Sequence, residues 1–428
     1  MLQNFNKYRH FGSVRALSRP PLWWRVISLY LSEKMKKLEN VHLMAMLILL
    51  VAVGQMAQTL YVPTIAQIAR DFAVTPGAVQ RVMAAYLMMY GLSQLVYGPV
   101  SDRVGRRPVI FTGMLIFLLG AAGALLAPSL NALVVAGAVQ GMGTGVAGVM
   151  ARTMPRDLYA GHALRQANSL LNMGILVSPL LAPIIGGTLA GWFGWRACFA
   201  FLLLLCSGVA LAMYRGLPET RPAAQTPRAL FSGFKPLLAD GNFSRYLVIL
   251  MGALAGIAVF EASCGVLMGG ALGLSSLTVS ILFILPLPAA FFGAWFAGKA
   301  GASFHHLMWY AVLSCLLAGL MMWVPGWFGI MTIWTLIIPA ALFFFGAGML
   351  FPLATTGAME PFPYLAGAAG ALVGGMQNMG SGLVAWLSSM LPQTGQFSLG
   401  LLMFAMAVLM LLCWWPMAAR HQEAGDAA

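Results

Sequence analysis

Glu261 is the residue whose type and position carry the most chemical information, because it is an acid inside a long apolar segment, Ile257–Cys264. The other ten Asp and Glu residues fall in predicted loops, chain ends or helix ends. An ionisable group inside a membrane span is costly and usually functional, and burial favours its neutral form. We expect Glu261 to hold and release a proton or to help bind cations. A protonated acid hydrogen-bonded to a neighbouring helix is the structural alternative.

Polar and aromatic side chains recur at helical spacing in other apolar segments, which is typical of residues that line a cavity. Two glutamines with a threonine share one predicted helix face, and two tyrosines with a glutamine follow on the next helix. An apolar cavity with a few polar groups suits hydrophobic ligands. For any single aromatic, core packing or a lipid-facing position is the alternative. The expected substrate-binding residues are Gln55, Gln58, Thr59, Tyr86, Tyr90, Gln94, Phe260, Phe283 and Trp334.

A charged loop at Gly98–Pro108 has the spacing of a conformational switch. Its aspartate, at a helix end, can pair with an arginine or with a facing helix N-terminus. Its arginines can clamp carbonyl or carboxylate groups in one state and release them in another, and Gly98 would allow close helix approach. A plain basic loop is the alternative. The expected switch residues are Gly98, Asp102, Arg103, Gly105, Arg106 and Arg107.

The predicted helix within Gln166–Trp195 carries a stripe of small residues, one every four positions, from Gly174 to Gly186. Such a stripe allows close helix packing in a membrane, and Pro179 and Pro183 add kinks. Generic tight packing is the structural alternative to a functional motif.

The elements that position these residues follow from the distribution of charge. Only 8% of the 428 residues are charged and 60% are apolar, whereas soluble domains are about 25% charged. These values exclude an ordinary soluble enzyme, a disordered chain and a nucleic-acid binder, despite the net charge of +13. Charge-free runs long enough to cross a membrane predict an all-α membrane protein with twelve transmembrane helices, arranged as six, a linker and six.

The basic residues predict the topology. With the N-terminus in the cytoplasm, 21 of the 24 Lys and Arg residues fall on the cytoplasmic side, so both termini are expected there. Residues 1–34 are expected to be a mobile arm or an upstream misread start. The predicted division is a cytoplasmic arm (1–41), a six-helix bundle (42–215), a cytoplasmic linker (216–243), a second six-helix bundle (244–418) and a cytoplasmic tail (419–428).

The loop at Gly98–Pro108 resembles the signature G-x-x-x-D-R-x-G-R-[RK] of the major facilitator superfamily, and the resemblance extends over nearly the whole chain. Ala182–Gly187 resembles the G-P-x-x-G-G motif of its drug/proton antiporters, with Ala182 replacing the first glycine. The resemblance implies two pseudo-symmetric six-helix bundles and proton-driven export of hydrophobic compounds by alternating access. The helix-5 antiporter motif would comprise Gly174, Pro179, Pro183, Gly186 and Gly187.

The sequence departs from that family pattern at three further positions. The usual helix-4 arginine would fall at Gly137, and the helix-1 acid of many drug exporters would fall at Thr59. In the second half, Ala297 stands where the first half has Asp102. Proton coupling through the first two sites is therefore excluded, which leaves Glu261 by elimination.

The expected partners are hydrophobic or amphipathic small molecules, protons and the lipid bilayer of a bacterial inner membrane. We expect a monomer without cofactor, metal or nucleic acid. A transporter of one specific metabolite, working by symport or export, is the main alternative. An intramembrane enzyme is disfavoured because no aspartate lies inside a span and all six histidines lie near ends or loops.

Overall fold

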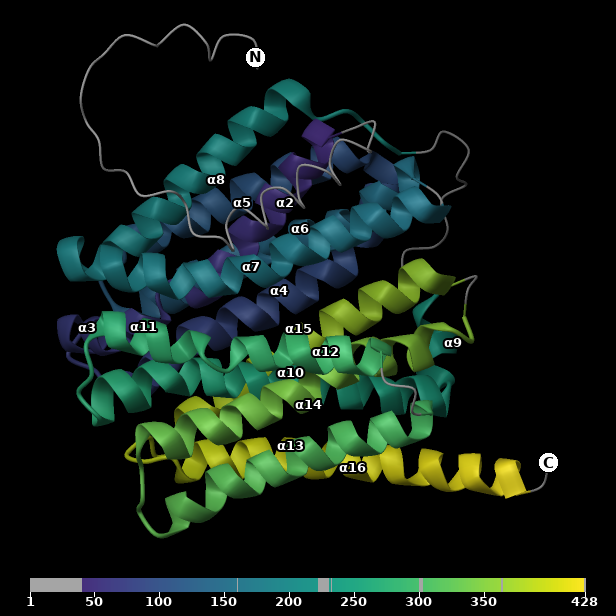
Figure 1. Ribbon diagram of the computed structural model, residues 1–428. Coiled ribbons are helices and arrows are strands. Elements are labelled where there is room, and N and C mark those ends of the chain that lie inside the picture. The colour runs from purple at the N-terminus through teal and green to yellow at the C-terminus, as the bar shows by residue number, and fades with distance from the viewer. Residues whose placement is uncertain are drawn as a thin grey trace, which may run out of the picture. The chain divides into compact units, whose positions relative to one another are not determined.

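The computed structural model describes residues 41–159, 161–221, 231, 233–299, 303–362 and 365–426, and over these residues every regular element is a helix (Figure 1). From His42 onward the chain forms one compact unit. The arm predicted at residues 1–34 lies outside the described residues.

The first six predicted spans correspond to a series of helices whose ends are set by proline and by short caps. The first span is interrupted beside Pro63, which has no backbone N–H to donate. Pro76 opens the second, and the Ser129 side chain accepts from the Ala132 N–H at the start of the fourth. The elements are α2 (Val41–Thr59), η1 (Val62–Thr64), α3 (Ile65–Asp71), α4 (Pro76–Val104), α5 (Arg106–Leu125), α6 (Leu130–Leu158), α7 (Gly161–Phe193) and α8 (Arg196–Gly216).

The second half repeats the series after a short helix in the linker. Side-chain oxygens cap several helix starts: Asp240 accepts from the Phe243 N–H, and Thr332 forms a reciprocal cap with Thr335. The elements are α9 (Phe234–Ala239), α10 (Gly241–Cys264), the π-helical η2 (Gly265–Ala271), α11 (Ser276–Ile284), α12 (Leu287–Lys299), α13 (Phe304–Trp327), α14 (Ile333–Met359), α15 (Ala366–Met390) and α16 (Phe397–Asp426).

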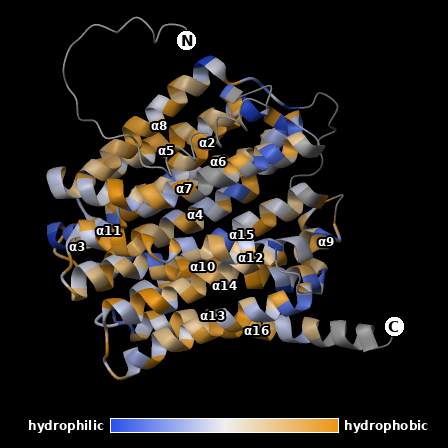
Figure 2. Cartoon of the chain, viewed as in Figure 1, coloured by the Kyte–Doolittle hydropathy of each residue, from blue (hydrophilic) through white to orange (hydrophobic). Residues whose placement is uncertain are grey.

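The helices have the length and composition of membrane spans. Within the described ranges, nine are long and apolar enough to cross a bilayer, and Val177–Phe193 is a shorter apolar stretch of α7. α4 and α15, with 29 and 25 residues, are also long enough but more polar. Figure 2 shows hydrophobic residues along most helices and many hydrophilic residues near their ends. Exposed apolar side chains such as Leu204 and Leu119 are those expected to face lipid. The predicted all-α, twelve-span fold is confirmed.

The two halves meet where α4 packs against α15 and α7 against α11. Glycines bring the first pair together, because a Cβ at Gly91 would lie 2.5 Å from the Met379 backbone N, and one at Gly382 would lie 2.6 Å from that of Met88. In the second pair, the Ser280 hydroxyl of α11 donates to the Pro183 carbonyl of α7 at 2.7 Å. The Pro183 carbonyl thus accepts a side-chain hydrogen bond from the opposite half.

Gly186 of α7 is expected to be intolerant of a side chain. A Cβ there would collide with the Leu60 carbonyl oxygen at the end of α2, whereas one at Gly191 would meet nothing within 4 Å. Because overpacking costs about 1–3 kcal/mol, Gly186→Ala should lower the thermal unfolding temperature of the purified protein, and Gly191→Ala should not. Equal unfolding temperatures for the two variants would contradict this packing.

Candidate functional site

Glu261 lies on α10 at the contact between the two halves. Its side chain is 5% exposed, and its Oε2 accepts a hydrogen bond from Gln58 Nε2 of α2 at 2.9 Å. In the described part of the chain, no lysine or arginine forms an ion pair with it. The neighbouring Phe260 packs edge-on against Phe344, with ring centroids 5.7 Å apart. The acid is therefore enclosed by apolar groups and held by one neutral donor from the opposite half.

The other predicted polar residues of α2 lie close to Gln58 but bond differently. Thr59 is buried, and its hydroxyl donates to the Gln55 carbonyl one turn earlier at 3.4 Å. Gln55 and Gln58 are half-buried. Of the three predicted residues, the structure brings only Gln58 into hydrogen-bonding contact with Glu261.

The Tyr86 hydroxyl is engaged inside the first half. It donates to the Gly54 carbonyl of α2 at 2.7 Å and lies 2.9 Å from the Thr144 hydroxyl of α6. The Tyr90 ring lies 6.0 Å from that of Tyr86, and both tyrosines are buried. In this conformation Tyr86 ties three helices together, so it can reach a ligand only after these bonds rearrange.

The predicted aromatics of the second half divide into two groups. Phe260 and Phe283 are each 1% exposed, on α10 and α11. Trp334, at the start of α14, is 67% exposed and does not share the burial of the other two. Trp327 and Phe328 are also exposed at the neighbouring end of α13. Aromatic side chains collect at helix ends because the membrane interface accommodates their amphipathic rings.

Arg106 is the centre of the charged loop and is 2% exposed. Its Nη1 donates to Asp102 Oδ1 at 2.5 Å and to the Ser101 hydroxyl at 2.9 Å. On the other side, its Nε donates to Asp157 Oδ2 of α6 at 3.0 Å. A buried guanidinium thereby joins the end of α4, the start of α5 and the end of α6. Asp157 was not among the predicted switch residues, although it is an acid at the expected end of a helix on the same side.

Glu219, which follows α8, caps α5 and was also not predicted. Its carboxylate accepts from the backbone N–H groups of Arg106 (2.9 Å), Arg107 (3.0 Å) and Arg221 (3.0 Å). Gly105 has a φ of 110°, and a Cβ there would lie 2.7 Å from Glu219 Oε2. Partial burial raises the pKa of Glu219, but the backbone N–H bonds from Arg106, Arg221, Arg107 and Thr220 outweigh it and lower the pKa.

Neutralising Glu219 is expected to loosen the start of α5. Glu219→Gln should speed hydrogen exchange of the Arg106 and Arg107 amides, because an amide oxygen is a weaker acceptor than a carboxylate. A carboxyl with a lowered folded pKa stabilises above its unfolded pKa and loses this contribution as pH falls through the folded value. The protection in the wild type should therefore decline on acidification, and in Glu219→Gln it should not. A shared pH dependence would contradict the cap.

The remaining predicted glycines and prolines have distinct surroundings. The close approach expected at Gly98 is absent, because a Cβ there would meet only Val149 Cγ1, at 3.8 Å. Gly105 is needed instead for its positive φ. Gly187 packs against Ser280 of α11, and the Pro183 carbonyl accepts a hydrogen bond from the Ser280 hydroxyl. This part of the α7 motif therefore touches the opposite half. Pro179 lies inside α7, and Gly174 lies where only the path of that helix is described.

The remaining switch residues, Arg107 and Arg103, bond to residues at and just beyond the end of α8. Arg107 Nη2 donates to the Tyr214 carbonyl at 3.1 Å, and the Arg103 carbonyl accepts from Arg221.

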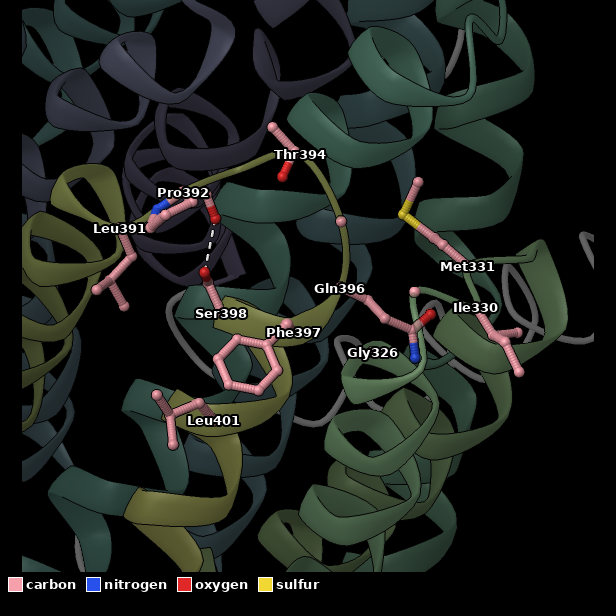
Figure 3. Close-up of a pocket in the computed structure, with 12 residues that line it drawn as sticks. Gly326, Ile330, Met331, Leu391, Pro392, Thr394, Gln396, Phe397, Ser398 and Leu401 are labelled. Carbon is pink, nitrogen blue, oxygen red and sulfur yellow. Dashed lines mark hydrogen bonds between the residues drawn. The ribbon is translucent and has the colours of Figure 1, made fainter.

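A pocket of about 500 Å³ lies between the α13–α14 and α15–α16 connections (Figure 3). Beside it, the Ser398 hydroxyl donates to the Pro392 carbonyl at 2.6 Å. The pocket belongs to the second half alone and contains none of the predicted substrate-binding residues.

Comparisons with known proteins agree with this architecture. The Major Facilitator Superfamily profile matches residues 47–385. The chain is 65% identical to multidrug resistance protein D of Escherichia coli (strain K12), over 92% of this chain and all of that protein. It is 29% identical to a chloramphenicol resistance protein of Pseudomonas aeruginosa, over 73% and 75% of the two chains. The structure of the E. coli xylose transporter XylE matches with a TM-score of 0.65 at 14% identity, over 87% of this chain and 97% of that one.

Proposed function

The chain belongs to the Major Facilitator Superfamily, and from this premise we propose that it is a proton-coupled multidrug exporter. It moves hydrophobic and amphipathic compounds across the bacterial inner membrane by alternating access. The resistance proteins among its relatives, one of them 65% identical, support export of drugs. A transporter rather than an enzyme is the class to which this family points.

The observation that carries the coupling mechanism is the buried hydrogen bond between Glu261 and Gln58, which joins the two halves. An ionised Glu261 is unfavourable in this apolar surrounding, so protonation favours the closed seam. When the halves separate, water or a substrate reaches the carboxyl group and the proton leaves. Proton entry from one side and release to the other then drives the conformational cycle.

The network at Arg106 sets the balance between the conformations. Its bonds to Asp102 and Asp157 hold the ends of α4, α5 and α6 together. Separation of the halves at this end requires these helices to move as a unit. The charged loop therefore acts as a rigid link in the first half, and it transmits the state of the seam along the bundle.

The orientation follows from the distribution of charge. The basic residues concentrate on the side of the loop at Gly98–Pro108, and this side faces the cytoplasm with both termini. The predicted division into arm, bundle, linker, bundle and tail applies to the working protein. It works as a monomer, because each chain carries both halves of the seam.

The direction of coupling tests this function against transport of one metabolite by symport. Purified protein in liposomes, with an imposed pH gradient, should accumulate structurally unrelated hydrophobic dyes against the proton flow. Movement of dye with the proton flow, or transport of one compound only, would favour the alternative. Liposomes without protein are the control.

A further inference from the structure

Arg152 and Gln94 meet at the seam between the halves, at the end of the bundle that carries the charged loop. A Cβ on Gly374 of α15 would lie 2.5 Å from Gln94 Oε1 and would collide with Arg152 Nη1. Arg152 Nη1 also donates to the Gly370 carbonyl, at 3.2 Å. Gln94 of α4 and Arg152 of α6 thus place an amide oxygen and a guanidinium next to the same residue of α15, Gly374.

Gln94 has an unused acceptor. The residue is 1% exposed, and its Oε1 has no hydrogen-bond partner within the described ranges. Its Nε2 lies on the side of the Tyr90 hydroxyl, because a Cβ on Gly148 would be 2.9 Å from each. A buried acceptor without a partner is costly. When the seam opens, a ligand that donates a hydrogen bond to Gln94 Oε1 would remove this cost. The open, ligand-bound state would then be favoured over the closed, empty one.

Arg152 supplies the complementary charge. The ion pairs among the described residues involve Arg106 and Arg196, so Arg152 has no carboxylate partner there. It is exposed, so it is accessible from solvent at this end. A guanidinium without a carboxylate binds an anionic or strongly accepting group through charge-assisted hydrogen bonds.

We propose that Arg152 and Gln94 form a head-group subsite for lipophilic carboxylic acids. A carboxyl group matches the pair, because its O–H donates to Gln94 Oε1 while its other oxygen accepts from Arg152. The ionised form is held by Arg152. The apolar body of the ligand then extends along the opened seam. This inference rests on the proposed export function and adds a substrate class to it.

The test compares two ligands of equal chain length, dodecanoate and dodecyltrimethylammonium, on the purified protein in liposomes. Wild-type protein should export both. Arg152→Gln should weaken binding of the ionised dodecanoate by ~10-fold or more, because a charge-assisted hydrogen bond is lost. Gln94→Leu should weaken binding by a similar factor only where the ligand carries its proton, because the bond to Gln94 Oε1 requires the carboxyl O–H. Binding of the ammonium compound by Arg152→Gln should change little, and this also shows that this variant is folded. Arg156→Gln removes the same charge one turn along α6 and should leave both ligands unaffected.

Two results would overturn the subsite. If Arg152→Gln and Gln94→Leu weaken both ligands equally, the pair is a latch between the halves and does not recognise the head group. If Arg156→Gln weakens dodecanoate as much as Arg152→Gln does, the effect is that of general positive charge. If the wild type exports neither ligand, the proposed function fails instead.

Discussion

Replacing Glu261 with glutamine is expected to reduce export driven by a pH gradient to the level of liposomes without protein. Glutamine retains the size of the side chain but has no titratable group, so no proton can be carried at the seam. Exchange of substrate between the two sides without a gradient should persist, because it requires only the change of conformation. The measurement is uptake of one dye by proteoliposomes, with and without the gradient.

Two further variants separate proton transfer from the hydrogen bond itself. Glu261→Asp keeps a titratable group but is one methylene shorter, so it should retain weakened coupling. Gln58→Leu removes the donor that holds Glu261 Oε2 at 2.9 Å, and it should alter the pH dependence of export without abolishing it. If Glu261→Gln pumps as the wild type does, the elimination that singled out this acid is wrong.

Replacing Arg106 with leucine is expected to produce the largest loss of stability. The guanidinium is 2% exposed and pairs with Asp157, whose side chain is 8% exposed. Removing one partner of a buried pair leaves an uncompensated charge and costs about 3–5 kcal/mol. Arg106→Lys should lose less stability than Arg106→Leu but should remain less stable than the wild type. An ammonium cannot match the planar guanidinium that reaches Asp102, Ser101 and Asp157. Thermal unfolding of the purified variants measures the effect.

The partner of Arg106 provides an internal control. Asp157→Asn should relieve part of the penalty in Arg106→Leu, because the unpaired carboxylate is then removed. Arg107→Leu should cost much less, since its side chain donates to one exposed carbonyl, that of Tyr214. Additive effects of Arg106→Leu and Asp157→Asn would contradict a direct buried pair.

The sequence was sufficient to predict the twelve spans, because charge-free runs of the required length have no alternative in a membrane. The gaps between α5 and α6 and between α15 and α16 contain Pro128 and Pro392, a residue type that cannot continue a helix. Helix ends carry clear local signals, such as proline and capping side chains.

The predicted candidate site was only partly recoverable, because contacts between distant helices leave no local pattern. Glu261 could be singled out, but its bond to Gln58 joins residues 203 positions apart. Trp334 was predicted to line the cavity, because periodicity along the sequence cannot distinguish a residue that faces the cavity from one at the membrane interface near a helix start. Glu219 acts on α5 from more than a hundred residues away. Gly98 illustrates the same limit, since its type suggested close packing while Gly105 has the required backbone conformation.

Proton release on substrate binding tests the coupling role of Glu261 most directly. Purified protein in unbuffered detergent solution is mixed with a saturating neutral hydrophobic substrate, and the change in pH is recorded. The wild type should release protons on binding, and Glu261→Gln should bind the substrate without releasing any. Equal release by the two proteins would show that another group carries the proton and would contradict the mechanism.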